Sequence, residues 1–162
     1  MRRACDKLAS SRIINKPTIF EVPQPRIQSC RDRGRVQPLP LAVEFRHRSW
    51  CRDSVFAGLE QRGITLVSVD APALPDLFPP LAIVTNPALF YLRLHGRNQA
   101  GWRSGSKQQQ FDYDYTTAEL EQWSRERIPS MRALCGRGVI LFNNHVAGQA
   151  VRNARTMDDL LR

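Results

Sequence analysis

Short apolar runs alternate with helical patterns from Leu41 to the end of the chain. The apolar runs predict strands at residues 41–47, 64–70, 90–96 and 139–145. Apolar residues recur at helical spacing over residues 53–63, 116–135 and 148–161. Thr116 and Glu119 have the spacing of a capping box, and Asp53 or Ser54 is the expected N-cap of the first helix. Strands that alternate with helices in this order predict an α/β fold with a parallel sheet.

Two connections lack a helical pattern. Residues 71–87 contain five prolines, which predict an extended loop. Residues 97–115 are polar with interspersed aromatic side chains, and we expect a loop there as well. Pro129 lies inside the third helical pattern and should kink or split that helix.

Every predicted strand ends in polar residues, and all three histidines of the chain lie at these ends. In parallel sheets and β/α barrels, ligand sites form beyond the C-terminal ends of the strands. The alternation of side chains along a strand puts Tyr91, Arg93 and His95 on one face and Phe90, Leu92 and Leu94 on the other. We expect the apolar face to pack under helices. We expect the polar groups to converge at one mouth, with Glu44, Asp70, Arg93, His95 and Asn143 at the same end of the sheet.

The net charge of +9 is concentrated near the N-terminus. Residues 1–39 hold nine Lys or Arg against three Asp or Glu, whereas residues 40–162 hold fifteen against twelve. We interpret residues 1–39 as a basic, largely irregular leader in which only residues 18–22 look like a strand. A nucleic-acid interface would favour basic residues on a folded face, so we do not favour nucleic-acid binding through this leader. No apolar run is long enough to span a bilayer, and the start lacks the apolar block of a signal peptide, so we expect a cytoplasmic protein without a membrane partner.

Five blocks of the sequence carry a resemblance to a known family. They are VEFRHRSW at 43–50, VSVD at 67–70, YLRLHGRN at 91–98, FDYDYTTAELEQW at 111–123 and LFNNHVAGQAVRNA at 141–154. In this order they resemble the C-terminal half of the YecE-like family, domain of unknown function 72, whose members are similar to TIM-type barrels. The resemblance implies a partial TIM-type β/α barrel made of about the last four βα units, with residues 40–162 as that half domain.

The resemblance implies no established activity, so the candidate chemistry comes from the residues. Arginine forks bind phosphate or carboxylate, and a carboxylate near a histidine can act as a general base. We therefore expect a strand-end site for a small anionic or sugar-like ligand, of a hydrolase-like or isomerase-like kind. The candidate catalytic residues are Glu44 or Asp70 as base and His95 as acid. The candidate ligand-binding residues are Arg46, His47, Arg93, Gly96, Arg97, Asn98, Tyr113, Asn143, Asn144 and His145.

Several alternatives remain open at this point. The charges around Glu44 are also compatible with a structural ion-pair network, and the chain with a truncated, catalytically inactive remnant of the family. Three histidines and two carboxylates permit a divalent metal, which two nearby arginines disfavour, so we assign no metal site and no cofactor. Trp102, Phe111, Tyr113 and Tyr115 form either a stacking wall over the ligand or packing for the rim. A half barrel would leave open edges and an uncovered face, so we expect self-association.

Overall fold

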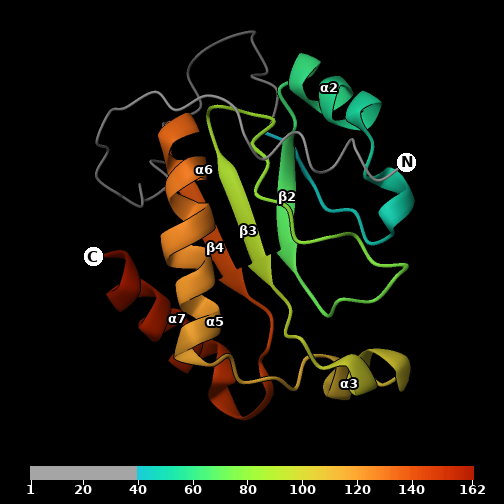
Figure 1. The fold of residues 1–162 in the computed structure, drawn as a ribbon, viewed down its shortest axis with the longest axis vertical. Helices are drawn as coiled ribbons and strands as arrows, with labels where there is room; N and C mark the ends of the chain where they lie inside the picture. The colour runs from blue at the N-terminus through green and yellow to red at the C-terminus, as the bar shows by residue number, and fades with distance from the viewer. Residues whose placement is uncertain (1–39) are drawn as a thin grey trace, which may run out of the picture.

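The computed structural model describes residues 40–162, and its centre is a four-stranded parallel sheet. The strands follow one another in space in the same order as in the sequence. In Figure 1 the arrowheads of β2, β3 and β4 point the same way, and α3 lies beyond them. The strands are β1 (Ala42–Val43), β2 (Thr65–Asp70), β3 (Phe90–Leu94) and β4 (Gly138–Phe142).

The four strands lie where the sequence pattern predicts them, but β1 is much shorter than expected. The chain leaves the sheet after Val43, because the following residues pair with the proline-rich segment instead. Arg48 N–H donates to the Asp76 carbonyl at 2.9 Å, and Phe78 N–H donates to the Arg46 carbonyl at 2.9 Å. The backbone groups that would have extended β1 along β2 therefore form hydrogen bonds with the proline-rich loop.

The three predicted helical segments are present, but they differ from the prediction in detail. Helix α2 (Asp53–Gln61) has Arg52 as its N-cap, so the expected N-cap at Asp53 or Ser54 was one or two residues too late. Thr116 and Glu119 form the predicted capping box at the start of α5. The remaining elements are η1 (Arg48–Trp50), α5 (Thr117–Glu121), η2 (Gln122–Arg127), α6 (Ile128–Leu134), η3 (Val146–Gly148) and α7 (Gln149–Leu161).

Pro129 was predicted to kink or split the third helical segment, but it does neither. The helix continues and widens before the proline. Figure 1 shows α5 and α6 as one continuous helix. The turn between them, η2, is a π-helix, in which Ile128 N–H donates to the carbonyl of Trp123, five residues earlier. Proline has no N–H and its ring crowds the preceding turn, so a wider turn accommodates it without ending the helix.

Residues 71–89 contain no helix, as their prolines predict, but the expectation for residues 97–115 was wrong. That segment contains two short helices, α3 (Gln99–Arg103) and α4 (Lys107–Gln110). Asn98 and Ser106 supply their caps, each accepting a hydrogen bond from a backbone N–H of the first turn. Short capped helices of this kind depend on side-chain hydrogen bonds rather than on apolar periodicity.

One face of β3 packs under helices, as predicted. Phe90, Leu92 and Leu94 are each at most 2% exposed and join a core with Trp123 and Met157. Figure 1 shows α5, α6 and α7 along this side of β3 and β4. The opposite face is partly uncovered, with Val139 and Leu141 of β4 exposed. A second core cluster surrounds β2 and contains Phe56, Leu59, Leu66 and Phe78.

Two predictions concern residues outside the described part of the chain. The basic leader and its strand at residues 18–22 both lie there. Within residues 40–162, no helix has the length and apolar character needed to cross a membrane.

Candidate functional site

Glu44 is the centre of a polar cluster at the C-terminal ends of β1 and β3. Its Oε1 accepts from Arg46 Nε at 2.8 Å and lies 3.0 Å from His95 Nε2, while its Oε2 accepts from Arg93 Nη1 at 2.7 Å. Glu44 is mostly buried and His95 is almost completely buried, whereas Arg46 is half exposed. The structure thus brings together four of the residues that the sequence predicted for the site.

The electrostatics of this cluster keep Glu44 ionised. Burial alone would raise the pKa of the Glu44 carboxyl, but the hydrogen bond from His95 and the charges of Arg46 and Arg93 outweigh it and lower the pKa to about 2. A carboxylate only accepts hydrogen bonds, so His95 Nε2 carries the hydrogen between them. In the neutral ring, Nδ1 of His95 is then the acceptor. Glu44 is consequently a weak base that orients His95, and the acceptor nitrogen of His95 is the better candidate for a proton-accepting group.

Asp70 is the centre of a second cluster. Its Oδ1 accepts from Arg97 Nε at 2.9 Å and from the Tyr115 hydroxyl at 2.8 Å. Its Oδ2 accepts from Arg97 Nη2 at 2.7 Å and from the Trp123 indole N–H at 2.6 Å. Four donors on a carboxylate that is 2% exposed leave no open acceptor position for a substrate. This arrangement is that of a structural anchor between the sheet and the helices.

Asp70 lies at the same end of the sheet as Glu44, as predicted, but the two carboxylates do not share one mouth. In the sheet register, Val69 is paired with Arg93, and Asp70 is paired with Leu94. Paired residues of neighbouring strands point to the same side, so Asp70 shares the helix-covered face of Leu94 and lies on the opposite side from Arg93. Both carboxylates lie at the same end of the sheet, but the sheet separates them.

Arg97 and Tyr113 belong to the Asp70 cluster rather than to the Glu44 cluster. Arg97 also pairs with Glu119 at 3.2 Å, and the hydrogen bond to Asp70 raises the pKa of its guanidinium. The Tyr113 hydroxyl donates to the same Glu119 oxygen; burial and then this hydrogen bond raise the pKa of Tyr113 to about 12. Both side chains are therefore committed to partners within the fold.

Gly96 and Asn98 shape the turn after β3. Gly96 has a φ of +91°, and a Cβ at this position would lie 2.6 Å from Cβ of Tyr113, so the turn requires glycine. Its N–H donates to the Tyr115 hydroxyl at 2.9 Å. Asn98 caps α3 and donates to the carbonyls of Gln109 and Asp112. These two predicted ligand-binding residues have local structural roles.

The Asn143-Asn144-His145 run at the end of β4 divides between several environments. Asn143 extends the pairing with β3, because its N–H donates to the Leu94 carbonyl at 2.8 Å. Asn144 is fully buried and donates to the Tyr113 carbonyl at 2.8 Å and to Asn153 Oδ1 at 2.6 Å. His145 is exposed, and its Nδ1 lies 3.0 Å from the Asn143 carbonyl. Asn144 thus ties the strand end to α7.

His47 and the predicted aromatic wall are also separated by the structure. His47 is exposed and accepts from Ser49 N–H at the start of η1. Tyr113 and Tyr115 pack edge to face beside Asp70, with ring centroids 5.1 Å apart. Trp102 and Phe111 instead border His95, with ring centroids at 6.3 and 5.9 Å from it. Two of the four aromatic residues therefore belong to the Glu44 cluster.

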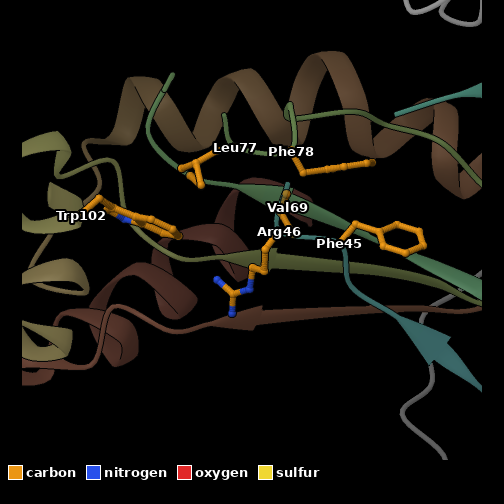
Figure 2. A pocket seen from close by; sticks show the side chains of 7 residues that line it. Phe45, Arg46, Val69, Leu77, Phe78 and Trp102 are labelled. Atoms are coloured by element: carbon orange, nitrogen blue, oxygen red, sulfur yellow. The ribbon is translucent and has the colours of Figure 1, made fainter. Parts of the chain in front are cut away.

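A small pocket adjoins the Glu44 cluster. Figure 2 shows Trp102 and Phe45 on two sides of it, with Leu77 and Phe78 above and the guanidinium of Arg46 pointing away from them. The pocket is mainly apolar, and Arg46 is the cation in its lining. Its empty volume of about 200 Å³ is smaller than the roughly 300–1,000 Å³ of typical ligand pockets, so it can hold only part of a small molecule.

Some residues of these networks were not singled out as site residues from the sequence. Trp123 and Glu119 look like a helix anchor and a capping residue, and they have those roles in addition to their contacts with the Asp70 cluster. Asn153 is 4% exposed and lies four residues before buried Met157 on the same side of α7. A polar residue on the apolar side of a helix was the signal that marks Asn153 as part of a buried network.

The described part of the chain contains no preformed metal site. Among residues 40–162 no three His, Cys, Asp or Glu side chains are grouped as a metal would need. The Glu44 cluster contains one carboxylate and one histidine beside two arginines, which is a donor set for anions rather than for a dication.

The fold defines the class of protein. A parallel sheet in sequential strand order, with helices along one face and a polar cluster at the C-terminal ends of the strands, is part of a TIM-type barrel. The chain belongs to the family described as protein of unknown function DUF72, whose model matches residues 14–162.

Relatives from three bacteria agree with this assignment. The chain is 29% identical over 133 residues to the UPF0759 protein YunF of Bacillus subtilis, covering 76% of this chain and 47% of that protein. Among solved structures it is similar to a DUF72 family protein from Thermotoga maritima, with a TM-score of 0.71, 38% identity, and coverage of 76% of this chain and 46% of the other. A DUF72 family protein from Enterococcus faecalis has a TM-score of 0.68 at 32% identity, over 75% of this chain and 47% of the other. The chain thus spans about half the length of these relatives.

Proposed function

We propose that the chain binds a small anionic molecule, one that bears a phosphate or carboxylate group, at the Glu44 cluster. The supporting observation is an imbalance of charge. Arg46 and Arg93 both pair with the single carboxylate of Glu44, which leaves a positive charge uncompensated within the cluster. An anion between the two guanidinium groups would balance that charge.

The donors of the two arginines support the same proposal. A guanidinium carries five N–H donors, and Glu44 takes up one nitrogen of each arginine. Nε of Arg93 is buried and has no hydrogen-bond acceptor among the described residues. Buried donors in native proteins are usually paired, and a bound ligand is one way in which they become so. Planar guanidinium forks match phosphate and carboxylate oxygens.

The contrast with Asp70 supports a ligand site over a structural ion-pair network at Glu44. At Asp70, one carboxylate receives four donors and one arginine is shared by two carboxylates, so donors and acceptors are matched. At Glu44, two arginines share one carboxylate and donors remain. The first cluster fits a structural role, and the second fits binding.

Calorimetric titration tests the proposal. Inorganic phosphate and acetate are titrated into the chain at low ionic strength, with glucose as a neutral comparison. We expect saturable binding of at least one anion and none of glucose. Arg93→Gln should weaken anion binding by about tenfold or more, since a charge-assisted hydrogen bond contributes on the order of 1.5–3 kcal/mol.

Arg125→Gln is the matched control for this titration. Arg125 pairs with Glu121 at 2.8 Å on the surface of the helix, and its side chain is 72% exposed. Its loss removes the same charge without touching the cluster. The proposal fails if no anion binds, or if Arg93→Gln and Arg125→Gln bind anions equally well.

A further inference from the structure

Two ring nitrogens beside the Glu44 cluster are buried without partners. His95 is 1% exposed, and its Nδ1 has no hydrogen-bond partner among the described residues. The same holds for the indole Nε1 of Trp102. A buried polar atom without a hydrogen bond is unfavourable, because it has lost its water and gained nothing in return.

The two nitrogens have complementary hydrogen-bonding roles. The indole nitrogen of Trp102 only donates. Because His95 Nε2 donates to Glu44, the Nδ1 of the neutral ring accepts. The two rings are close neighbours, because they stand edge to face with their centroids 6.3 Å apart. A hydroxyl is the simplest group that accepts from one neighbour and donates to another.

Trp102 also connects this pair to the proposed anion site. It lines the pocket that Arg46 borders (Figure 2). Arg46 and His95 both contact Oε1 of Glu44. Arg46, Arg93 and His95 therefore surround one carboxylate, and Trp102 borders His95. Phe111, whose ring centroid is 5.9 Å from that of His95, adds an apolar wall that suits the carbon chain of such a molecule.

We propose that the ligand is a hydroxylated anion, whose phosphate or carboxylate lies on Arg46 and Arg93 and whose hydroxyl lies between Trp102 Nε1 and His95 Nδ1. This inference rests on the anion site proposed above and narrows its ligand class. Trp102 is a specificity-determining residue in this arrangement. Glu44 is a positioning residue that fixes which nitrogen of His95 accepts.

The test compares two ligands of the same charge and chain length. Glycerol 3-phosphate carries hydroxyls, and n-propyl phosphate has none. We expect glycerol 3-phosphate to bind the chain at least about tenfold more tightly in calorimetric titrations. In Trp102→Phe this ratio should fall to about one. Trp50→Phe is the control: Trp50 is half exposed, stacks on Phe45 and should keep the ratio of the unchanged chain.

A spectroscopic measurement on the unchanged chain covers the case in which Trp102→Phe does not fold. The chain has three tryptophans, so its ¹⁵N spectrum contains three indole N–H signals to assign. Glycerol 3-phosphate should shift the Trp102 signal, and n-propyl phosphate should leave it in place. Equal affinity for the two ligands, with the Trp102 signal unmoved by both, would overturn the hydroxyl subsite and leave the anion site standing. Failure of every anion to bind would overturn both proposals.

Discussion

At the level of residues, the two carboxylates at the strand ends differ in how completely they are bonded. Asp70 accepts four hydrogen bonds on the helix-covered face of the sheet. Glu44 lies on the other face and holds two arginines and one histidine. Asp70 therefore contributes to stability, while Glu44 organises the groups that we propose to bind an anion.

Replacing Asp70 by asparagine tests its structural role. Asp70→Asn removes the negative charge that faces Arg97 and puts an amide N–H₂ where donors already point. We expect the free energy of unfolding, measured in urea, to fall by about 3 kcal/mol. Asp158→Asn, which breaks an exposed pair with Arg162 on α7, should have little effect. Equal effects of the two substitutions would contradict the structural role.

The lowered pKa of Glu44 predicts a pH dependence of stability. Its folded pKa is about 2 against an ordinary value of 4.5, so its contribution is complete above pH 4.5 and is lost as the pH falls towards 2. We expect this loss to amount to on the order of 2–3 kcal/mol. Unfolding titrations from pH 6 to pH 2 should therefore show a steeper loss in the unchanged chain than in Glu44→Gln. Parallel curves for the two chains would show that Glu44 is not stabilised as described.

The sequence predicted which polar residues gather at the strand ends, but not how they divide. The alternation of side chains along β3 correctly placed Arg93 and His95 on one face of the strand and Leu92 on the other. It did not reveal that Asp70 faces the helices, because the register of β2 against β3 is set by long-range pairing. The roles of Asn98 and Asn144 as local anchors depend on loop geometry, which periodicity does not encode.

At the level of elements, β3 and β4 pack closely where Gly138 opposes Phe90. Gly138 opposes Phe90 in the register, and a Cβ on Gly138 would lie 2.1 Å from Cζ of the Phe90 ring. Glycine thus lets the aromatic ring lie directly against the neighbouring strand.

Two glycine substitutions test this contact. Gly138→Ala should lower the free energy of unfolding by about 1–3 kcal/mol, because the ring of Phe90 must move within a packed core. Gly136→Ala, two residues earlier, adds the same methyl group where nothing lies within 4 Å and should change stability by less than about 0.5 kcal/mol. Thermal or urea unfolding of both variants measures the difference. If both cost the same, the packing of β3 on β4 differs from that described.

Element types were predictable from the sequence where periodicity was strong. The strands and the helices α2, α5 to α6 and α7 follow apolar spacing, and the capping box at Thr116 marked a real helix start. The short helices α3 and α4 were missed because their stability comes from caps and from contacts with each other. The π-helix before Pro129 is a compromise between proline geometry and continued burial of Trp123, which only the packed structure reveals.

At the level of the whole molecule, the described residues form an open sheet. The face that carries Arg93 also carries Val139 and Leu141, which are 38% and 42% exposed. In a closed barrel this face points inward and is filled by side chains. The chain spans 46–47% of the related solved structures, so in those relatives further residues extend beyond the matched half.

Self-association stays a prediction, and the exposed face makes it specific. We expect the chain to sediment as a dimer or larger species at high concentration, because exposed apolar side chains on an open sheet favour contact with another surface. Leu141→Lys should shift the chain towards monomer. Val151→Lys, at a position 56% exposed on α7, should not. A monomer for the unchanged chain at high concentration would contradict this prediction.

We propose that the Glu44 cluster binds an anion and does not only stabilise the fold. The most direct measurement is the free energy of unfolding in urea as phosphate is raised at constant ionic strength, for the unchanged chain and for Arg93→Gln. A ligand of the native state raises stability by about 1.4 kcal/mol for each tenfold increase above its dissociation constant. We predict that rise for the unchanged chain and its loss in Arg93→Gln. A stability that is independent of phosphate in the unchanged chain, with a large destabilisation in Arg93→Gln, would show the cluster to be a structural ion-pair network and would contradict the account.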